Sequence, residues 1–306
     1  MAQEVSVIIP NFNGQKLLES NLPQVIKNCP NSEIILVDDA STDNSVSYVC
    51  KKFKKVKVYK FTKNHGFAFS ANFGAKKATS SLILLLNSDV SPSPNFLKPA
   101  TSLFKTTNVF AVALADESHE NGKVITRGRG GAEFKKGFLN HFAGSVERGE
   151  TLWVSGGSGL FDRKKFLDLG GFDLSFAPFY WEDIDLSYRA RKSGFICYFE
   201  PLAKVDHFHE EGAIKKTFSS SFIKTVSYKN QIIFIWKNIS DTNILINHLL
   251  WLPYHLGINI FSRNFSFIFG FAWAFLKLPS LIFNYEPAGT IYQLSDKEVL
   301  KNFAKP

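Results

Sequence analysis

Two adjacent carboxylates, Glu182 and Asp183, stand behind three aromatic residues in the run PFYWEDIDLSYRARKSGF, residues 178–195. The spacing of apolar residues predicts a helix that starts at Trp181, and Gly194 is a typical stop. Acids gather at helix N-termini because the helix dipole favours negative charge there. A carboxylate walled by aromatic rings can also take a proton from a hydroxyl group. Both interpretations stay open at this point.

The same predicted helix carries further charges that need no chemical role. Asp185 and Arg189 are four residues apart, so we interpret them as an exposed ion pair worth a few tenths of a kcal/mol. Arg189 and Arg191 are both suited to phosphate, but one helix cannot point them the same way. We favour Arg191.

A second group of polar residues follows four apolar runs near the start of the chain. The carboxyl ends of parallel strands open on one edge of a sheet, where ligands bind. Each loop alone is a common turn, but together, with three acids, they indicate a site for a metal and a phosphorylated ligand. No GxGxxG or GxxxxGK[ST] motif is present, which argues against a dinucleotide fold or a P-loop. The residues are Pro10, Asn11 and Asn13, Asp38 and Asp39, Asn64 to Gly66, and Asn87, Ser88 and Asp89.

The elements that must position these side chains alternate between two periodicities. Short apolar runs typical of strands alternate with stretches of helical spacing. This rhythm predicts an α/β fold with a mostly parallel sheet flanked by helices and joined by right-handed crossovers. The predicted strands are 5–10, 33–39, 56–61, 81–89 and 109–115, and the predicted helices are 15–28, 42–53 and 67–79.

The middle of the chain is rich in glycine and has weak periodicity. We expect residues 116–150 to form a long loop or a hairpin that covers the site. Gly156, Gly157 and Gly159 permit either tight turns or a close approach of the backbone to a ligand, and turns are the simpler interpretation of each one.

Composition limits the class of protein. The chain has 306 residues, a net charge of +9 and a pI near 9.3, which attracts anionic partners. The lysine-rich run 51–60 shows strand alternation, so we interpret it as a solvated helix end and strand face, and no nucleic-acid-binding signature accompanies it. Three scattered cysteines and the absence of a signal-like start favour a reducing, cytoplasmic setting.

Six motifs occur in an order that resembles one known family. They are SVIIPNFNG, ILVDDASTDNS, KNHGFAFSANFGAKKA, LLLNSDV, LGGFD and FYWEDIDLSYRARKSGF, between residue 5 and about residue 209. The ordered set resembles the glycosyltransferases of family 2, which have the two-lobed GT-A fold. It looks especially like the rhamnosyltransferase-type branch of bacterial surface-polysaccharide enzymes.

The resemblance implies roles for individual residues. Asp183 would be the general base, with Glu182 beside it, and Asp38 would hold the nucleotide base. Asn87 to Asp89 occupy the DxD position, so Asp89 would bind Mg²⁺ or Mn²⁺, although Asn87 replaces the first acid and removes one charge. The residues expected around the nucleotide sugar are Pro10, Asn11, Asp38, Asp39, Asn64, Gly66, Asn72, Asn87, Ser88, Trp181 and Arg191.

Two histidines, His207 and His209, follow an apparent strand. The family often has a histidine near the diphosphate or its metal, so His207 is either a second metal ligand or a structural residue. The chemistry fits: a cation stabilises the departing diphosphate, and a single base on the opposite face of the sugar gives direct displacement with inversion.

After about residue 216 the composition becomes aromatic and aliphatic. We predict a catalytic domain over 1–215, with a nucleotide-sugar half at about 1–115 and an acceptor half at about 150–215, followed by a helical extension over 216–306. Its last apolar run, 265–276, is short for a membrane span, and polar residues and Pro253 interrupt the run before it. We favour helices lying on an anionic membrane surface. The alternative is helices that pack on the catalytic domain or a second subunit.

The sequence therefore predicts an inverting glycosyltransferase at the cytoplasmic face of the membrane, which moves a sugar from a nucleoside diphosphate to a glycan, expected to be lipid-linked. A non-catalytic nucleotide-sugar-binding or scaffold protein is the alternative. A nucleotidyltransferase is less favoured because PNFNG lacks a glycine-rich phosphate loop. A nucleic-acid-binding protein is supported by the net charge and by no other feature of the sequence.

Overall fold

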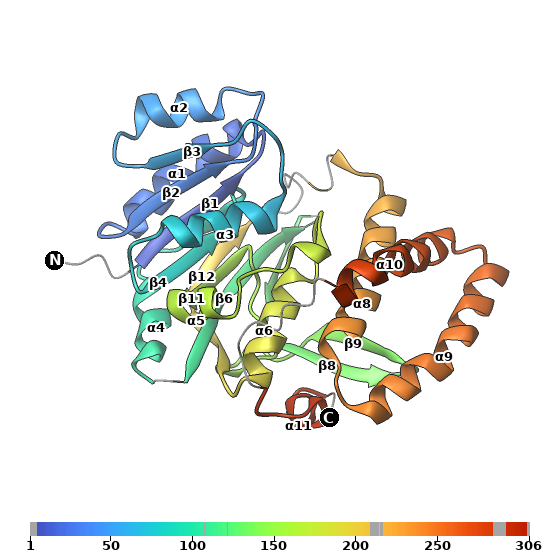
Figure 1. The fold of residues 1–306 in the computed structure, drawn as a ribbon. Helices are drawn as coiled ribbons and strands as arrows, with labels where there is room; N and C mark the ends of the chain where they lie inside the picture. Colours follow the sequence, from blue (N-terminus) through green and yellow to red (C-terminus); the bar gives the residue numbers. More distant parts are fainter. Residues whose placement is uncertain are drawn as a thin grey trace.

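The computed structural model describes residues 5–106, 108–120, 122–208, 214, 217–283 and 292–304, so His209 lies outside the described residues. A ten-stranded sheet forms the centre of the molecule (Figure 1). Eight of its strands follow one another in the order β10-β12-β6-β11-β4-β1-β2-β3, while β5 pairs with β12 and β7 pairs with β6. Strands β3, β2, β1 and β4 are parallel, whereas β11 runs antiparallel to both of its neighbours. The predicted α/β fold with a mostly parallel sheet is confirmed.

The first half of the sheet follows the predicted alternation. Every residue of β2 is buried, as expected for a strand covered on both faces. Apolar residues of α1, α2 and α4 pack on one face, and those of α3, α5 and α6 pack on the other. The elements are β1 (Val5–Asn11), α1 (Gln15–Asn28), β2 (Glu33–Asp38), α2 (Ser45–Lys52), β3 (Lys57–Lys60), α3 (Phe67–Lys77) and β4 (Leu82–Leu86).

A buried carboxylate joins several segments at the edge of the sheet where the parallel strands begin. Glu33, at the start of β2, accepts hydrogen bonds from Ser6 (2.5 Å), Lys57 (2.5 Å) and the Thr79 backbone (2.9 Å). Burial alone raises the pKa of a carboxyl group, but these bonds lower the pKa of Glu33 to about 2. The ionised carboxylate therefore stabilises the fold.

The second half of the sheet brings the later sequence motifs to the edge at which β1, β2 and β4 end. β11 starts at Ser158 opposite Leu86, the last residue of β4. β12 ends at His207, which pairs with Val90 of β5 and with Ser118 of β6. The elements are β5 (Val90–Pro92), α4 (Leu97–Ser102), β6 (Val109–Glu120), β11 (Ser158–Asp162), α5 (Arg163–Asp168), α6 (Glu182–Lys192) and β12 (Ile196–His207).

The glycine-rich region forms hairpins rather than one long loop. β7 (Lys123–Arg127) pairs with the end of β6, and β8 (Gly130–Lys135) pairs with β9 (Phe138–Ala143) in a separate sheet. The short β10 (Gly149–Glu150) then joins the main sheet beside β12. The hairpin alternative of the prediction is thus the one observed.

The C-terminal helices share a core with the helix that carries Glu182 and Asp183. Trp181 and Tyr188 pack with Phe234 of α8, and Leu139 of β9 and Phe267 of α10 belong to the same cluster. The helices are α8 (Ser220–Asn238), α9 (Thr242–Phe261), α10 (Phe265–Phe283) and α11 (Asp296–Lys301). The region after residue 216 is therefore packed on the rest of the chain through α8, α10 and α11 (Figure 1).

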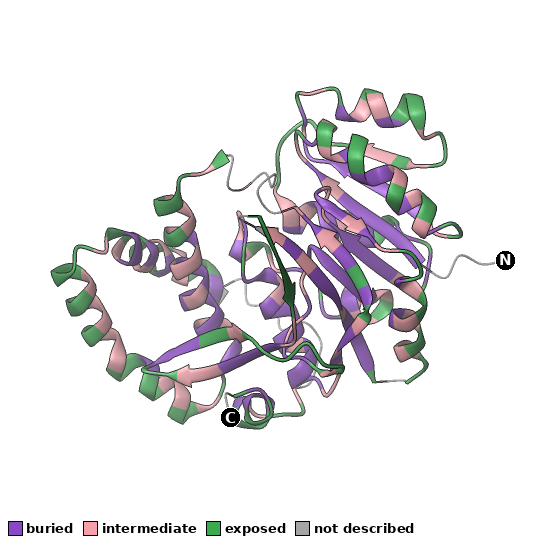
Figure 2. Cartoon of the chain, turned by 180° about the vertical axis from the view of Figure 1, so that it is seen from behind, coloured by how far each residue is buried: buried purple, intermediate pink, exposed green. Residues whose placement is uncertain are grey.

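Helix α9 lies at the outside of the molecule and packs on the same core through one face only, which carries Ile244, Leu245 and Leu252. His248 is its one buried residue, and nearly its whole length is exposed or partly exposed (Figure 2). With 20 residues and a mean hydropathy of 1.2 over its most apolar window, α9 is long and apolar enough to cross a membrane by length and composition alone. The sequence analysis did not expect this, because Pro253 and polar residues interrupt the run; the helix continues through them.

Candidate active site

The loops after β1 and β2 are joined by a buried amide and a buried carboxylate. Asn11 Nδ2 donates to Asp38 Oδ1 at 2.8 Å and to Ser41 Oγ at 3.2 Å. Asp38 Oδ2 accepts from the Ser41 backbone at 3.1 Å, and Asp38 is fully buried. Asp38, expected to hold the nucleotide base, thus lies beneath the loop and fixes its shape.

Asp39 ties the loop after β3 to this edge. Its two carboxylate oxygens accept from the backbone of His65 at 2.8 Å and of Gly66 at 2.7 Å. Burial raises the pKa of Asp39 although these bonds oppose the shift. Gly66 adopts φ +90°, a left-handed conformation that suits glycine, and lies next to the Pro178 carbonyl. The third loop therefore meets the segment before α6, and Asn64 on it is exposed.

The Asn87 to Asp89 loop lies between two glycines. The Asn87 backbone donates to the Gly157 carbonyl at 2.9 Å, and a Cβ on Gly157 would lie 2.6 Å from Asn87 Nδ2. On the other side, a Cβ on Gly14 would lie 3.3 Å from Ser88 Oγ and 2.4 Å from Asn11 Oδ1. Gly156 and Gly157 form a turn, as the simpler interpretation predicted. Gly157 also leaves room for the Asn87 side chain, whereas Gly14 was not singled out.

His207 stands between two aspartates. Its Nε2 lies 3.4 Å from Asp89 Oδ1, and its Nδ1 lies 2.6 Å from Asp116 Oδ2. Burial lowers the pKa of this imidazole, but hydrogen bonds to Asp116 and Asp89 outweigh it and raise the pKa to about 9. Apart from this 3.4 Å contact with His207, Asp89 Oδ1 is buried without a hydrogen-bond partner among the described residues. Asp116 was not predicted from the sequence, because it lies 91 residues before His207 and reaches it only through strand pairing.

Asp183 begins α6 at the same edge of the sheet. Its Oδ2 accepts from the Gly156 backbone at 3.4 Å and its Oδ1 from the Ile184 backbone at 2.8 Å. Burial raises the pKa of Asp183 above its usual range in spite of these bonds. Glu182 beside it is 8% exposed, and burial together with the Asp183 charge raises its pKa to about 8. Asp183 is the more exposed of the pair and sits on the glycine loop that also contacts Asn87.

Three predicted binding residues hold the protein together in this structure. Asn72 exchanges two 2.8 Å hydrogen bonds with the Phe172 backbone. Trp181 is buried, and its ring packs against His141 and Phe234. Arg191 bonds to Glu150 at 2.6 Å and to two backbone carbonyls, near the opposite end of α6 from Asp183. We therefore leave these three side chains out of the proposed site.

The expected exposed pair on α6 is wrong. Asp185 is fully buried, and it accepts from Arg189 at 2.7 Å and from Asn238 at 2.8 Å. Arg189 also donates to the carbonyls of Leu169 and Gly171. Helix α8 covers this face of α6, which the local spacing did not reveal.

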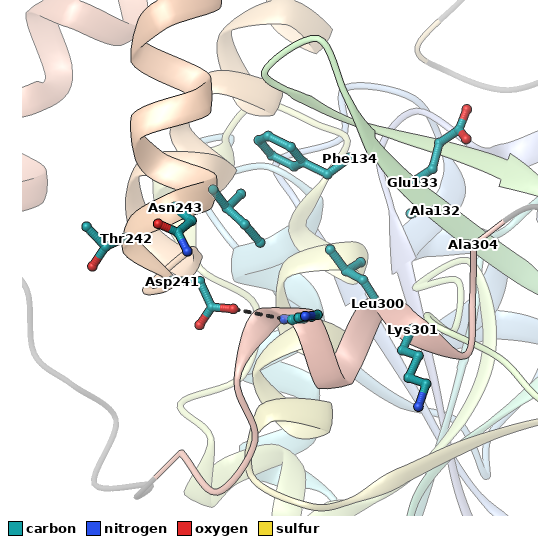
Figure 3. A pocket seen from close by; sticks show the side chains of 11 residues that line it. Ala132, Glu133, Phe134, Asp241, Thr242, Asn243, Leu300, Lys301 and Ala304 are labelled. Carbon is teal, nitrogen blue, oxygen red and sulfur yellow. Dashed lines mark hydrogen bonds between the residues drawn. The ribbon is translucent and has the colours of Figure 1, made fainter.

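A separate surface pocket of about 680 Å³ lies between β8, the start of α9 and α11 (Figure 3). Phe134, Asp241, Leu300 and Lys301 are among its lining residues, and the Asp241 carboxylate accepts from the Lys297 backbone at 3.0 Å. None of the residues predicted for the active site lines it.

Comparison with known proteins identifies the family. The family model described as glycosyl transferase family 2 matches residues 6–170, more than half of the chain. The chain belongs to glycosyl transferase family 2. It is 24% identical over 252 residues to the chondroitin synthase of Escherichia coli, and the aligned region covers 68% of this chain and 34% of the relative. It is 38% identical over 89 residues to an uncharacterized glycosyltransferase of Rickettsia conorii, and the aligned region covers 28% of this chain and 15% of the relative. This family 2 chain thus spans about a third or less of the length of these relatives.

Solved structures share the fold of this glycosyltransferase chain. GalNAc-T7, crystallised with UDP, GalNAc and Mn²⁺, gives a TM-score of 0.64 at 19% identity and covers 78% of this chain and 48% of its own. The mannosyltransferase PcManGT of Pyrobaculum calidifontis, in complex with GDP-Man and Mn²⁺, gives 0.56 at 16% identity and covers 93% and 81%. Staphylococcus aureus TarS with UDP-GlcNAc gives 0.58 at 19% identity and covers 80% and 71%. These likenesses confirm the GT-A fold.

Proposed function

We propose that this glycosyltransferase moves a sugar from a nucleoside diphosphate to an acceptor hydroxyl by direct displacement with inversion. The observation that carries the proposal is Asp183, a carboxylate of raised pKa at the start of α6, on the glycine loop that also contacts Asn87. As the acceptor oxygen bonds to the anomeric carbon and the bond to the diphosphate breaks, Asp183 takes the hydroxyl proton. A raised pKa makes it a stronger base for that proton.

The donor half of the proposal rests on the polar loops at the carboxyl ends of β1 to β4. Structures of the same fold are complexes with UDP, UDP-GlcNAc or GDP-Man. Pro10, Asn64, Gly66, Asn87 and Ser88 are all at least partly accessible here. We assign them to the donor, while Asn11, Asp38 and Asp39 shape the loops beneath.

We further propose that Asp89 and His207 hold a divalent cation, Mg²⁺ or Mn²⁺. The buried Asp89 Oδ1, whose one polar contact among the described residues is the 3.4 Å approach of His207 Nε2, fits such an ion. Among the described residues no group of three His, Cys, Asp or Glu side chains is arranged to hold a metal ion, but Mg²⁺ commonly uses one or two protein ligands plus phosphates and water. When bound, the cation neutralises charge on the departing diphosphate. Asp116 orients the imidazole from Nδ1, and His207 must lose its proton to bind a cation.

The test is an Asp183→Asn variant, because Asn keeps the shape of the side chain and one of the two acceptor oxygens used by the Gly156 and Ile184 amides. Release of nucleoside diphosphate from UDP-GlcNAc, UDP-GalNAc, GDP-mannose and dTDP-rhamnose is measured with Mn²⁺. We expect turnover to fall by roughly 10²–10⁴-fold while thermal stabilisation by the donor persists. Asp168→Asn on α5, an exposed ion-pair residue, is the control. Undiminished turnover in Asp183→Asn contradicts the base assignment, and loss of folding supports a purely structural helix start.

We also propose that the sugar acceptor lies at the cytoplasmic face of a membrane, and helix α9 is the evidence for it. Such an acceptor would be a lipid-linked glycan of the kind that rhamnosyltransferase-type polysaccharide enzymes extend. Its exposed residues include Leu250 (74%) and Phe261 (87%), and the chain carries a net charge of +9. An apolar helix on a basic protein suits an anionic bilayer surface.

This membrane role is tested by sedimentation with phosphatidylcholine vesicles that contain phosphatidylglycerol. We expect Leu250→Glu with Phe261→Glu to lower vesicle binding. Leu202→Glu on β12 is the matched control, because Leu202 is 67% exposed and lies outside the C-terminal helices. Equal binding of the α9 variant and the control would remove the membrane from the proposal.

A further inference from the structure

Two side chains of α8 bind the loop that leads into Asp183. Asn230 Nδ2 lies 2.6 Å from the Phe176 carbonyl, 2.9 Å from that of Phe179 and 2.8 Å from that of Tyr180. Lys229 Nζ donates to the Ala177 carbonyl at 2.5 Å. Two adjacent residues thus hold four carbonyls of the segment 176–181, which we call the aromatic loop.

The aromatic loop needs such support. Tyr180 and Trp181 both have positive φ, +70° and +77°, in the left-handed region that non-glycine residues rarely adopt. Such backbone persists when its surroundings over-determine it, and it clusters at functional sites. Asp183 follows two residues later, so any relaxation of the aromatic loop changes the direction of its carboxylate.

The two donors are themselves fixed. Asn230 and Lys229 are fully buried, and the Lys229 ammonium lies 4.5 Å from the centre of the Trp273 ring of α10. An amide nitrogen has two hydrogens, so three carbonyls at these distances share them. Removing the amide leaves buried carbonyls without a donor, which is costly in a low-dielectric interior.

We propose that Asn230, assisted by Lys229, is a positioning residue that sets the aim of Asp183 through the aromatic loop. The proposal rests on the proposed role of Asp183 as the base. It assigns a function to α8, which lies outside residues 6–170, the range matched by the family model.

The chain offers a matched control on the same helix. Asn238 is also buried, and its amide donates at 2.8 Å to Asp185 in the body of α6 instead of the aromatic loop. Asn230→Ala and Asn238→Ala therefore each remove one buried amide from α8, and they differ in which segment loses its donor. Asn230→Asp keeps the shape of the side chain and replaces the amide donor by a carboxylate oxygen, which repels the three carbonyls.

The first readout is amide hydrogen exchange of residues 174–183, which needs no substrate and leaves out Asp185, the contact of Asn238. We expect exchange in this segment to rise in Asn230→Ala and Asn230→Asp but not in Asn238→Ala. If both Asn230 variants fail to fold, Lys229→Met is tested in the same way. Unchanged exchange in a folded variant overturns the proposal, whatever the activity of the protein.

The second readout is turnover, measured as nucleoside diphosphate release from the donor that the wild-type protein accepts. We expect kcat of Asn230→Ala to fall on the order of a hundredfold, as for a small misplacement of a catalytic group, with KM for the donor unchanged. In an Asp183→Asn background the same substitution should cost no further turnover. A fall in the Asn238→Ala control of the same size, or a further loss in the double variant, overturns the positioning role. A wild-type protein inactive on every donor counts against the proposed function, and hydrogen exchange then decides the aromatic-loop contact alone.

Discussion

The buried ion pair between α6 and the C-terminal segment offers the sharpest test of how this fold is held together. Lys192 and Asp296 are both fully buried, with Nζ 3.0 Å from Oδ1. The Asp296 carboxylate also accepts from the Tyr188 hydroxyl at 2.8 Å and from the Ser240 and Asp241 backbones at 2.7 and 2.8 Å. We predict that Asp296→Asn, which keeps the shape and removes the charge, strongly destabilises the protein.

The expected magnitude follows from the burial. Removing one partner of a buried pair leaves an uncompensated charge and costs about 3–5 kcal/mol. Average unfolding entropies imply that each kcal/mol lowers Tm by about 1.6 °C for a chain of 306 residues. We therefore expect Tm to fall by about 5–8 °C.

Calorimetry and urea unfolding of the wild type and two variants measure the effect. The control is Asp168→Asn, which breaks an exposed pair with Lys164 (side chains 53% and 84% exposed). We expect no measurable loss there, because solvent and salt screen such pairs. If Asp296→Asn lowers Tm no more than Asp168→Asn does, the reasoning that burial makes this contact valuable is refuted.

Three further predictions address stability and the site. The carboxylate of Glu33, with its pKa lowered to about 2 from 4.5, contributes about 3 kcal/mol that is present above pH 4.5 and lost as pH falls toward 2. The urea-unfolding stabilities of wild type and Glu33→Gln should therefore converge over that range. Gly157→Ala should push the Asn87 side chain aside and weaken donor binding in a thermal-shift assay with UDP-GlcNAc or GDP-mannose, with little change in the apo Tm. Gly74→Ala, whose Cβ would lie 2.4 Å from a core side chain, should lower the free energy of unfolding by about 1–3 kcal/mol. Gly257→Ala, in open space on α9, should raise it by up to about 1 kcal/mol. Changes of the same sign in the two variants would refute the packing argument.

Local periodicity was sufficient for the elements of the first third of the chain. The strands ending near Asn11, Asp38 and Leu86 and the helices between them lie where the apolar spacing predicted. Each of these strands is buried on both faces and each helix on one. Burial therefore produces a local pattern of apolar residues, a continuous run in a strand and a helical spacing in a helix, that can be recognised in the sequence. The convergence of the loops followed in turn, since parallel strands end at one edge.

The sequence by itself thus determined the α/β order, the family motifs and the edge at which the polar loops gather. Tertiary structure decided which polar residues face that edge and which lie beneath it, because hydrogen-bond partners such as Asn11 for Asp38 and Glu150 for Arg191 come from distant segments. It also decided that α8 buries Asp185 and holds the aromatic loop. Contacts between residues that are 27 to 54 positions apart, as in these examples, leave no periodic trace in the sequence. A polar residue bonded within its own turn or helix end has the same sequence pattern as one bonded across the fold.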